Sequence, residues 1–513
     1  MRKLTMILAA ILAFGCNSNQ TGPSVAVRPR TVITTDGEVD DYDSFIRLLL
    51  YSNEMDIQAI VYSASQWHWA GDGQGTPLLP ENRWEGPREG MAGPQFDAPK
   101  PSHRWIGMDW IPGIIDAYAQ CYDNLVRHDA RYPSPDYLRS IVKVGNIRVE
   151  GDMSDPTEGS EYIKGLLLDD TPGPLYLQIW GGTNTVARAL LDIAEQYKDT
   201  PEWETIYRKV SDKAVLYIIQ DQDGTYRNYV EANWPEIRAI YNGTQFFGFA
   251  YLWKRATPRP FQEVLTGKWF REHIVQDKGA LGALYMGAGI PYPFLDPEDH
   301  YGDPESVERN PGADFNDFIS EGDSPSYFYL FDFMGLRSLE HPEWGGIGGR
   351  FDEIRPHFWK DARDYNPFTG EMDIFYPQMR WTEVLQNDFA ARIDWCIKDY
   401  ADANHAPAAS VSGAHDRTVK PGEKVMLKGS ATDPDRDTVS LSWWQYREAG
   451  TSDAKLALES ADGAVVRITI PQDAKPGETF HLILEAKDSG NPELRHFQRV
   501  ILTVEPGFLK NDK

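Results

Sequence analysis

Four acidic side chains stand within six residues of one another in the sequence TTDGEVDD, Thr34–Asp41. Carboxylates crowded in this way repel one another, and burying them costs free energy unless a cation or a reacting group compensates their charge. Hard oxygen ligands on a tight, glycine-containing loop suit Ca²⁺, which takes about six to eight oxygens. Because one loop cannot supply so many, the sequence predicts a cation site to which other loops contribute. The four acids are Asp36, Glu38, Asp40 and Asp41.

The alternative explanation for these acids is structural. The first turn of a helix favours Asp and Glu because the helix dipole is positive there. In a chain with 77 acidic and 51 basic residues, such a cluster can also arise by chance. The position of the cluster favours the cation site, because it follows the apolar run of residues 30–33 and precedes an amphipathic stretch. Ligands of parallel α/β sheets bind beyond the carboxyl ends of the strands.

The elements that must position this loop are those of an α/β domain, which we expect over residues 28–402. Apolar runs without polar alternation predict buried strands, and the amphipathic stretches between them predict helices. Such strands form a mainly parallel sheet flanked by helices. The predicted strands are residues 31–35, 57–63, 175–180 and 214–220.

A long loop, Gln66–Gly113, follows the second predicted strand and contains five tryptophans. Loops of this length are usually functional or disordered, and the tryptophans argue against disorder. Two explanations are open. The indole rings pack a loop that is otherwise poor in core residues, or they form a rim on which sugar rings stack.

A different pattern begins after Asn404–Pro407, which we interpret as a linker between two separate cores. Residues 405–506 contain short runs of alternating apolar and polar residues, separated by turn sequences rich in Gly, Pro and Asp. This pattern predicts an Ig-like β-sandwich of about 100 residues. Its segment ATDPDRDTVSLSWWQY resembles the Ig-like modules of secreted bacterial carbohydrate-active proteins.

The amino terminus is expected to be a targeting segment rather than part of the fold. The run Met1–Phe14 has a basic start and an apolar remainder that is too short to span a membrane. Its end resembles the bacterial lipobox, which predicts a signal peptide over residues 1–15, a lipid on Cys16 and a tether over residues 16–27. Secretion with an incidental Cys16 is the alternative. The lipid would hold the protein outside the cytoplasm, on the periplasmic side or the surface of a bacterial membrane.

Charge and cysteine content limit the remaining possibilities. A net charge of -26 over 513 residues, with no run of Lys or Arg, argues against nucleic acid or an anionic membrane surface as a partner. Besides Cys16 the chain has Cys121 and Cys396, and the sequence leaves open whether these two form a disulfide or remain buried thiols.

Four segments, in order along the chain, resemble those of the nucleoside hydrolases. TTDGEVDD resembles their amino-terminal Asp-x-Asp-x-x-x-Asp-Asp signature. The later segments are WGGTNTVARAL (Trp180–Leu190), VEANWPEI (Val230–Ile237) and EGDSPSYFYLF (Glu321–Phe331). Over about residues 28–506 the chain is more closely similar to the cellulose-binding nucleoside-hydrolase-like proteins, which join this domain to a carboxyl-terminal Ig-like module.

The resemblance implies roles for individual residues. Asp36 would bind Ca²⁺ and accept a proton from an attacking water molecule, because water on a bound cation loses its proton more easily. The calcium ligands would be Asp36, Asp41, the backbone carbonyl of Trp180, and Asp323. The sugar contacts would be Asp40, Glu231, Asn233 and Asp323. The partner would be a sugar-containing small molecule or a polysaccharide.

Two positions depart from the family pattern. Thr34 replaces the first Asp of the signature, and Gly322 stands where some members have a histidine that protonates the leaving group. Two functions are therefore open. One is a calcium-dependent hydrolase of N-glycosidic or related glycosyl bonds, which the retained Asp36 favours. The other is a non-catalytic, carbohydrate-binding surface lipoprotein with a vestigial site. A hydrolase needs a proton donor, and the candidates are Glu321, His300 and His341.

Overall fold

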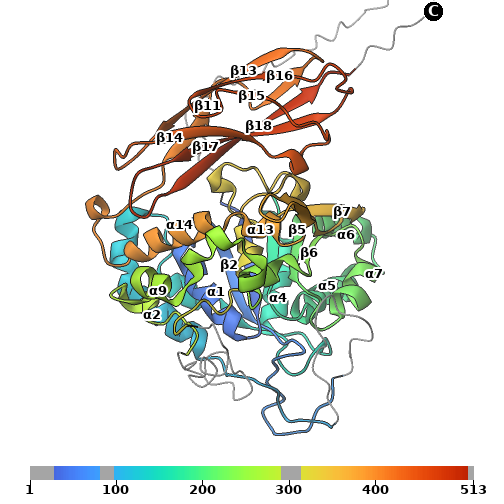
Figure 1. Ribbon diagram of the computed structural model, residues 1–513. Coiled ribbons are helices and arrows are strands. Elements are labelled where there is room, and N and C mark those ends of the chain that lie inside the picture. Colours follow the sequence, from blue (N-terminus) through green and yellow to red (C-terminus); the bar gives the residue numbers. More distant parts are fainter. Residues whose placement is uncertain (1–27, 81–97, 290–313, 507–513) are drawn as a thin grey trace, which may run out of the picture.

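The computed structural model describes residues 28–80, 98–289 and 314–506. They form a larger α/β body and a smaller β-sandwich that lies against one side of it (Figure 1). The predicted signal peptide, Cys16 and the tether lie outside the described residues, so lipid anchoring stays a prediction. In the described ranges no helix is both long enough and apolar enough to cross a membrane.

An eight-stranded sheet forms the centre of the body, in the order β3-β2-β1-β4-β5-β6-β8-β7. All neighbours pair in parallel except β7 and β8. Every residue of β4 and β5 is buried, as their unbroken apolar sequences predict. The strands are β1 Arg30–Thr35, β2 Asp56–Tyr62, β3 Val142–Val144, β4 Leu175–Ile179, β5 Ala214–Ile219, β6 Arg238–Asn242, β7 Phe351–Arg355 and β8 Phe358–Asp361.

Helices cover both faces of this sheet. Successive residues of a strand point to opposite faces, so Val32 packs with α4, α5 and α6 while Ile33 packs with α1, α2 and α14. The predicted α/β fold is therefore confirmed. The longer helices are α1 Val39–Leu50, α2 Trp110–His128, α3 Pro135–Ser140, α4 Glu158–Leu168, α5 Asn184–Tyr197, α6 Trp203–Lys213 and α14 Thr382–Asp394. The short ones are α7 Glu231–Asn233, α8 Trp253–Ala256, α9 Gly267–Phe270, α10 Gly279–Gly282, α12 Ser324–Phe328 and α13 Tyr376–Met379.

The carboxyl-terminal domain is a β-sandwich, also as predicted. Its two sheets have the orders β11-β13-β16-β15 and β12-β18-β17-β14, and the alternating burial along β13 matches its alternating sequence. The strands are β11 Ala408–Val411, β12 Asp416–Val419, β13 Lys424–Thr432, β14 Ser440–Gln445, β15 Leu458–Glu459, β16 Val465–Thr469, β17 Thr479–Lys487 and β18 Arg495–Val504. A hairpin of β9 Asp364–Asn366 and β10 Glu371–Asp373 completes the body.

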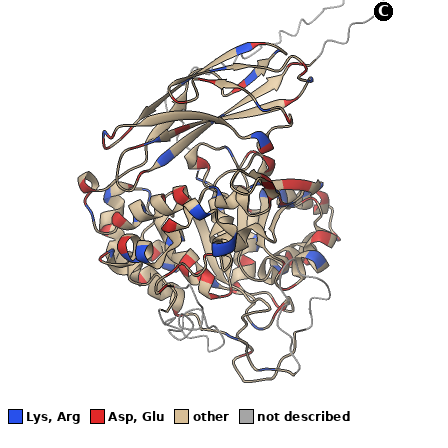
Figure 2. Ribbon diagram, viewed as in Figure 1, with Lys and Arg blue, Asp and Glu red and all other residues tan. Residues whose placement is uncertain are grey.

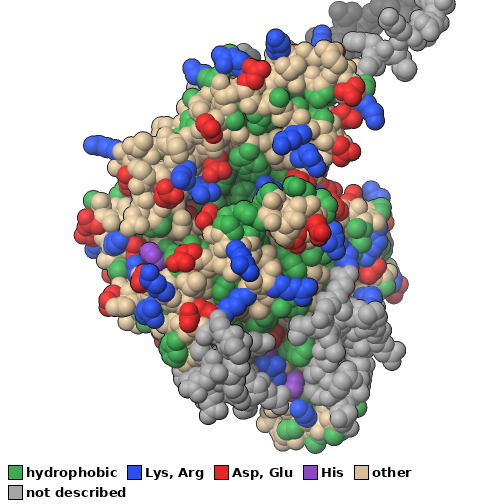
Figure 3. Space-filling view, in the orientation of Figure 1, with side chains coloured by type: hydrophobic (Ala, Val, Ile, Leu, Met, Phe, Trp, Pro, Cys, Tyr) green, Lys and Arg blue, Asp and Glu red, His purple; other side chains and the backbone are tan. Residues whose placement is uncertain are grey.

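The two domains pack against each other across an apolar interface. The sandwich has a core of its own, but four of its side chains belong to the larger buried cluster of the body. Figure 3 shows hydrophobic side chains gathered where the two domains meet. Residues 404–407 are therefore a short crossing between packed domains rather than a free linker. The four shared side chains are Tyr446, Ala449, Ile483 and Phe497.

Buried arginines reinforce this interface. Arg499 of β18 is fully buried and donates hydrogen bonds to the carbonyls of Leu336 (2.6 Å) and Gly345 (2.7 Å) in the body. Arg380 of the body lies over the ring of Tyr446, 4.5 Å from its centroid. Each guanidinium thus has at least one partner across the domain boundary.

Cys121 on α2 and Cys396, just beyond α14, are buried neighbours and both are free thiols. A hydrogen bond with Cys396 lowers the pKa of Cys121 to about 6, although burial acts in the opposite direction. The structure therefore holds this pair as two adjacent thiols.

Candidate functional site

The acidic loop lies at the carboxyl end of β1. Strand β1 ends at Thr35 and α1 begins at Val39, so residues 36–38 form the turn between them. Strand β4 pairs with β1 in parallel, with Thr34 opposite Ile179, and this register places the loop after β4 beside that turn. The predicted position beyond the strand ends is confirmed.

Two glycines allow neighbouring loops to approach these acids. A Cβ at Gly181, after β4, would lie 2.7 Å from Cγ of Asp36. A Cβ at Gly322, before α12, would lie 2.4 Å from Oδ2 of Asp40. Side chains of ordinary size do not fit at such distances, so a histidine at position 322 would collide with Asp40.

Three carboxylates from two distant segments meet at this point. Asp40, Asp41 and Asp323 each offer an oxygen, and the three oxygens lie within 4.8 Å of one another. Burial, followed by repulsion from the neighbouring acids, raises the pKa of Asp41 and of Asp323 well above the usual range of a carboxyl group. Without a cation, the cluster is thus electrostatically costly in its ionised form.

The hydrogen bonding of these acids fits a cation site. Asp36 is 1% exposed, and neither of its carboxylate oxygens has a hydrogen-bond partner among the described residues. The same holds for Oδ2 of Asp323. Buried carboxylate oxygens are nearly always hydrogen-bonded or bound to a metal. The converging oxygens of Asp40, Asp41 and Asp323, with Asp36 beside them, could therefore hold Ca²⁺, which prefers such oxygen ligands.

Asp41 also has the structural role that the alternative explanation proposed. It and Glu38 form a capping box at the start of α1, in which the amide of Glu38 donates to Oδ2 of Asp41 over 3.1 Å. Oδ1 of Asp41 accepts from the hydroxyl of Thr35. The capping bonds fix the orientation of Asp41 and leave its outer lone pairs for a cation.

Trp180 occupies the position predicted to offer a backbone carbonyl. Its indole nitrogen donates to Oγ of Ser326 (2.8 Å), which anchors the loop to α12. Its carbonyl accepts a hydrogen bond of 2.6 Å from the amide of Gln222. The Trp180 carbonyl keeps a second lone pair that could bind a cation. The side-chain oxygen of Gln222 is buried without a partner in the described chain. Sequence analysis missed Gln222, which follows β5.

Glu231 and Asn233 do not join this cluster, so their predicted role as sugar contacts in it is wrong. They form α7, shortly before β6 begins, and thus lie at the amino ends of the parallel strands. Glu231 pairs with Arg355 (2.7 Å) at the end of the antiparallel strand β7, on that same edge of the sheet. The acidic cluster lies at the opposite edge.

Neither of the two expected proton donors within the described ranges is placed to act at the cluster. Glu321 is fully buried and pairs with Arg47 at 2.6 Å, so its side chain is already engaged. His341 contacts Trp344, whose ring also contacts His481 of the sandwich, so His341 lies at the domain interface. His300 lies outside the described residues.

Among the described residues, a histidine that sequence analysis missed lies beside the cluster. Nδ1 of His68 lies 3.7 Å from Oδ2 of Asp36, and the side chain is buried. His68 comes from the tryptophan-rich loop after β2, which folds back to the strand ends. Trp69 in this loop and Trp110, the first residue of α2, are buried, so packing explains these two rings.

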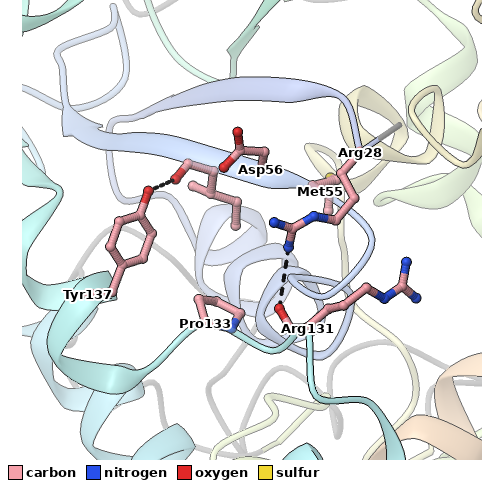
Figure 4. A pocket seen from close by; sticks show the side chains of 7 residues that line it. Arg28, Met55, Asp56, Arg131, Pro133 and Tyr137 are labelled. Carbon is pink, nitrogen blue, oxygen red and sulfur yellow. Dashed lines mark hydrogen bonds between the residues drawn. The ribbon is translucent and has the colours of Figure 1, made fainter. Parts of the chain in front are cut away.

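A cavity of about 270 Å³ lies elsewhere, where β1 and β2 begin. Figure 4 shows Arg28, Arg131 and Tyr137 around it; Arg28 donates to the carbonyl of Arg131 over 3.3 Å. Arg131 is itself paired with Asp129. The cavity is therefore remote from the acidic cluster, and its two arginines already have partners.

Family comparison agrees with this architecture. Residues 30–351 match the family described as cellulose-binding Sde182, nucleoside hydrolase-like domain. The chain belongs to this family. Residues 424–504 match the carboxyl-terminal domain of cellulose-binding protein Sde0182, so the family's two domains occur here in the same order.

Solved structures support the same fold. A nucleoside hydrolase-related hypothetical protein from Saccharophagus degradans, described as associated with carbohydrate metabolism, is 24% identical with a TM-score of 0.66. The alignment covers 93% of this chain and all of that one (100%). The effector protein XOO4466 is 11% identical, with a TM-score of 0.34 over 73% of this chain and 95% of that chain. This likeness is too low to bear on the fold. No curated protein matches the chain significantly.

Proposed function

We propose that this protein is a calcium-dependent hydrolase of N-glycosidic or related glycosyl bonds that acts outside the cytoplasm in carbohydrate use. The observation that carries the proposal is Asp36, a buried carboxylate whose oxygens have no hydrogen-bond partner in the described chain, beside three converging acids. Family membership and the carbohydrate association of the Saccharophagus protein support the same substrate class.

Asp36, Asp41, Asp323 and the carbonyl of Trp180 would hold the calcium ion. The bound ion would supply an acidified water molecule. Asp36 would accept the proton of that water. Asp40, whose Oδ2 accepts from the hydroxyl of Ser320 (3.4 Å), would orient a sugar hydroxyl together with Asp323. The negative charge of the cluster would stabilise the oxocarbenium character that develops at the anomeric carbon.

In the described part of the chain, the position that some nucleoside hydrolases fill with a leaving-group acid offers none. Gly322 lies against Asp40 and has no proton to offer. The proposal therefore favours substrates whose leaving group departs without protonation by the enzyme.

The second candidate function is binding without catalysis. The family is described as cellulose-binding, and Gly322 removes the acid that some nucleoside hydrolases use. In this case the protein would be a carbohydrate-binding surface lipoprotein, anchored through Cys16, with a vestigial hydrolase site.

A screen of the purified chain against nucleosides and plant or algal oligosaccharides distinguishes the two functions. Each substrate is incubated with calcium and with a chelator, and both product release and binding are measured. Calcium-dependent release supports the hydrolase. Binding of a sugar without release of product from any substrate supports the lipoprotein instead.

A further inference from the structure

The acidic cluster contains a second group of potential ligands. Asp36, Glu38 and His68 each offer one atom, and these atoms lie within 4.8 Å of one another. We propose that this group binds a second divalent cation, of the transition-metal class that accepts imidazole, beside the calcium position. Asp36 would bridge the two ions. This inference goes beyond the proposed function, which needs calcium alone.

The charge of the cluster supports a second cation. Its five carboxylates have a formal charge of -5 when ionised, and one calcium ion leaves three negative charges. Arg104 acts on Glu38 and offsets one of them. Four of the five acids are at most 5% exposed, so water screens the remaining charge poorly. The five are Asp36, Glu38, Asp40, Asp41 and Asp323.

Asp36 offers two oxygens for such a bridge. Both of its oxygens are buried, and neither accepts a hydrogen bond from the described chain. One oxygen can serve each ion. Gly37, at φ +84°, makes the tight turn that leads from Asp36 to Glu38, and a residue with a Cβ would be strained in that conformation.

His68 determines the kind of ion. Its backbone is fixed by Ser65, whose amide donates to the His68 carbonyl over 2.9 Å. Ca²⁺ prefers oxygen ligands, whereas Mn²⁺, Co²⁺ and Zn²⁺ accept imidazole together with carboxylates. The competing explanation is a simple ion pair, because a protonated His68 at 3.7 Å would neutralise Asp36.

Titration of the full chain with Co²⁺ in saturating Ca²⁺ tests the proposal. We expect one Co²⁺ per chain to bind while calcium stays bound, with a visible absorption band typical of nitrogen and oxygen ligands. Binding of Co²⁺ only by displacement of calcium, or no binding of Co²⁺, would overturn the proposal.

Variants locate the ion. His68→Phe keeps a ring of similar size without ligand atoms, and should weaken Co²⁺ binding on the order of 100-fold while calcium still raises the melting temperature. His68→Gln is the second choice if the first variant does not fold. His341→Phe, at an exposed histidine of the domain interface, is the matched control and should bind Co²⁺ normally.

Asp323→Asn separates this inference from the proposed function. It should weaken calcium binding and leave Co²⁺ binding within a few-fold of wild type. Unchanged Co²⁺ binding in both His68 variants would overturn the second site, whatever the outcome for calcium. If the wild-type chain binds no calcium, the proposed function is overturned instead.

Discussion

Two buried carboxylates, Asp36 and Asp364, have opposite surroundings. Asp364, near the domain interface, is fully buried and accepts hydrogen bonds from Arg350 (2.8 Å) and from the hydroxyl of Tyr446 (2.8 Å). Asp36 is equally buried and has no hydrogen bond to either oxygen within the described chain. Figure 2 shows acidic and basic residues mixed over both domains, so the contrast is local.

This contrast separates structural charges from functional ones. A buried ion pair contributes little net stability, but removal of one partner is expensive. The acidic cluster shows the reverse case. Like charges are brought together there at a cost in free energy, which a bound cation would offset. Perturbed acids in such a cluster are typical of functional sites.

The largest expected effect is on catalysis. Asp36→Asn cannot accept a proton, so it should reduce turnover by about 10²–10⁴-fold while ligand affinity falls by less than about tenfold. Steady-state kinetics and calorimetry on a substrate from the screen measure both values. Asp40→Ala is the comparison, since it should weaken binding itself. Full activity of Asp36→Asn would remove Asp36 as the base.

The second prediction compares the effects of the same two carboxylates on the free energy of unfolding. Asp364→Asn should lower the free energy of unfolding by about 3 kcal/mol, because Arg350 and Arg380 lose their buried counterion. Asp36→Asn should not destabilise the metal-free protein, since it removes a repelling charge. Urea unfolding in chelator measures both.

Asp352→Asn is the control for that experiment. Asp352 pairs with the same Arg350 but is largely exposed, so its loss should cost below about 1 kcal/mol. Equal losses for the Asp352 and Asp364 variants would contradict our view of the interface.

The third prediction concerns stabilisation by calcium. Calcium at about 100 times its dissociation constant should stabilise the chain by about 2.7 kcal/mol, because it binds only the folded state. Differential scanning calorimetry with calcium and with chelator shows the shift. Asp323→Asn should lose most of it. An unchanged melting temperature in wild type would argue against a calcium site.

The smallest effect concerns pH at the interface. Burial and the neighbouring Arg499 lower the pKa of His481 from 6.5 to about 2, so the unfolded chain binds the proton first as pH falls. Stability from this group is present above pH 6.5 and is lost below it. The loss is about 1.4 kcal/mol per pH unit, or about 2 kcal/mol at pH 5. His481→Asn, which keeps an acceptor for Arg499, should show a correspondingly smaller loss between pH 7 and pH 5 in urea unfolding.

The sequence predicted those parts of the site that lie within one short segment of the chain. The strand-turn-helix around Asp36 and the loop at Trp180 follow from short apolar runs and glycines. The Glu231 match failed because three residues do not determine at which edge of the sheet a segment lies. His68 was missed because a long loop returns it to the strand ends, which is decided by tertiary packing.

The domain interface was hidden for a related reason. Tyr446 and Phe497 alternate with polar residues as ordinary strand residues do, and alternation cannot show which face meets another domain. Only the fold reveals that these rings enter the core of the body.

The close contact at Gly322 has an evolutionary consequence. A Cβ there would lie 2.4 Å from a carboxylate oxygen of Asp40, so no single substitution can install a proton donor at that position without disturbing a neighbour. Any path from this site to one with a histidine there, in nature or in the laboratory, must therefore move the Asp40 carboxylate from its present position. The residue at position 322 and the conformation of Asp40 are thus coupled.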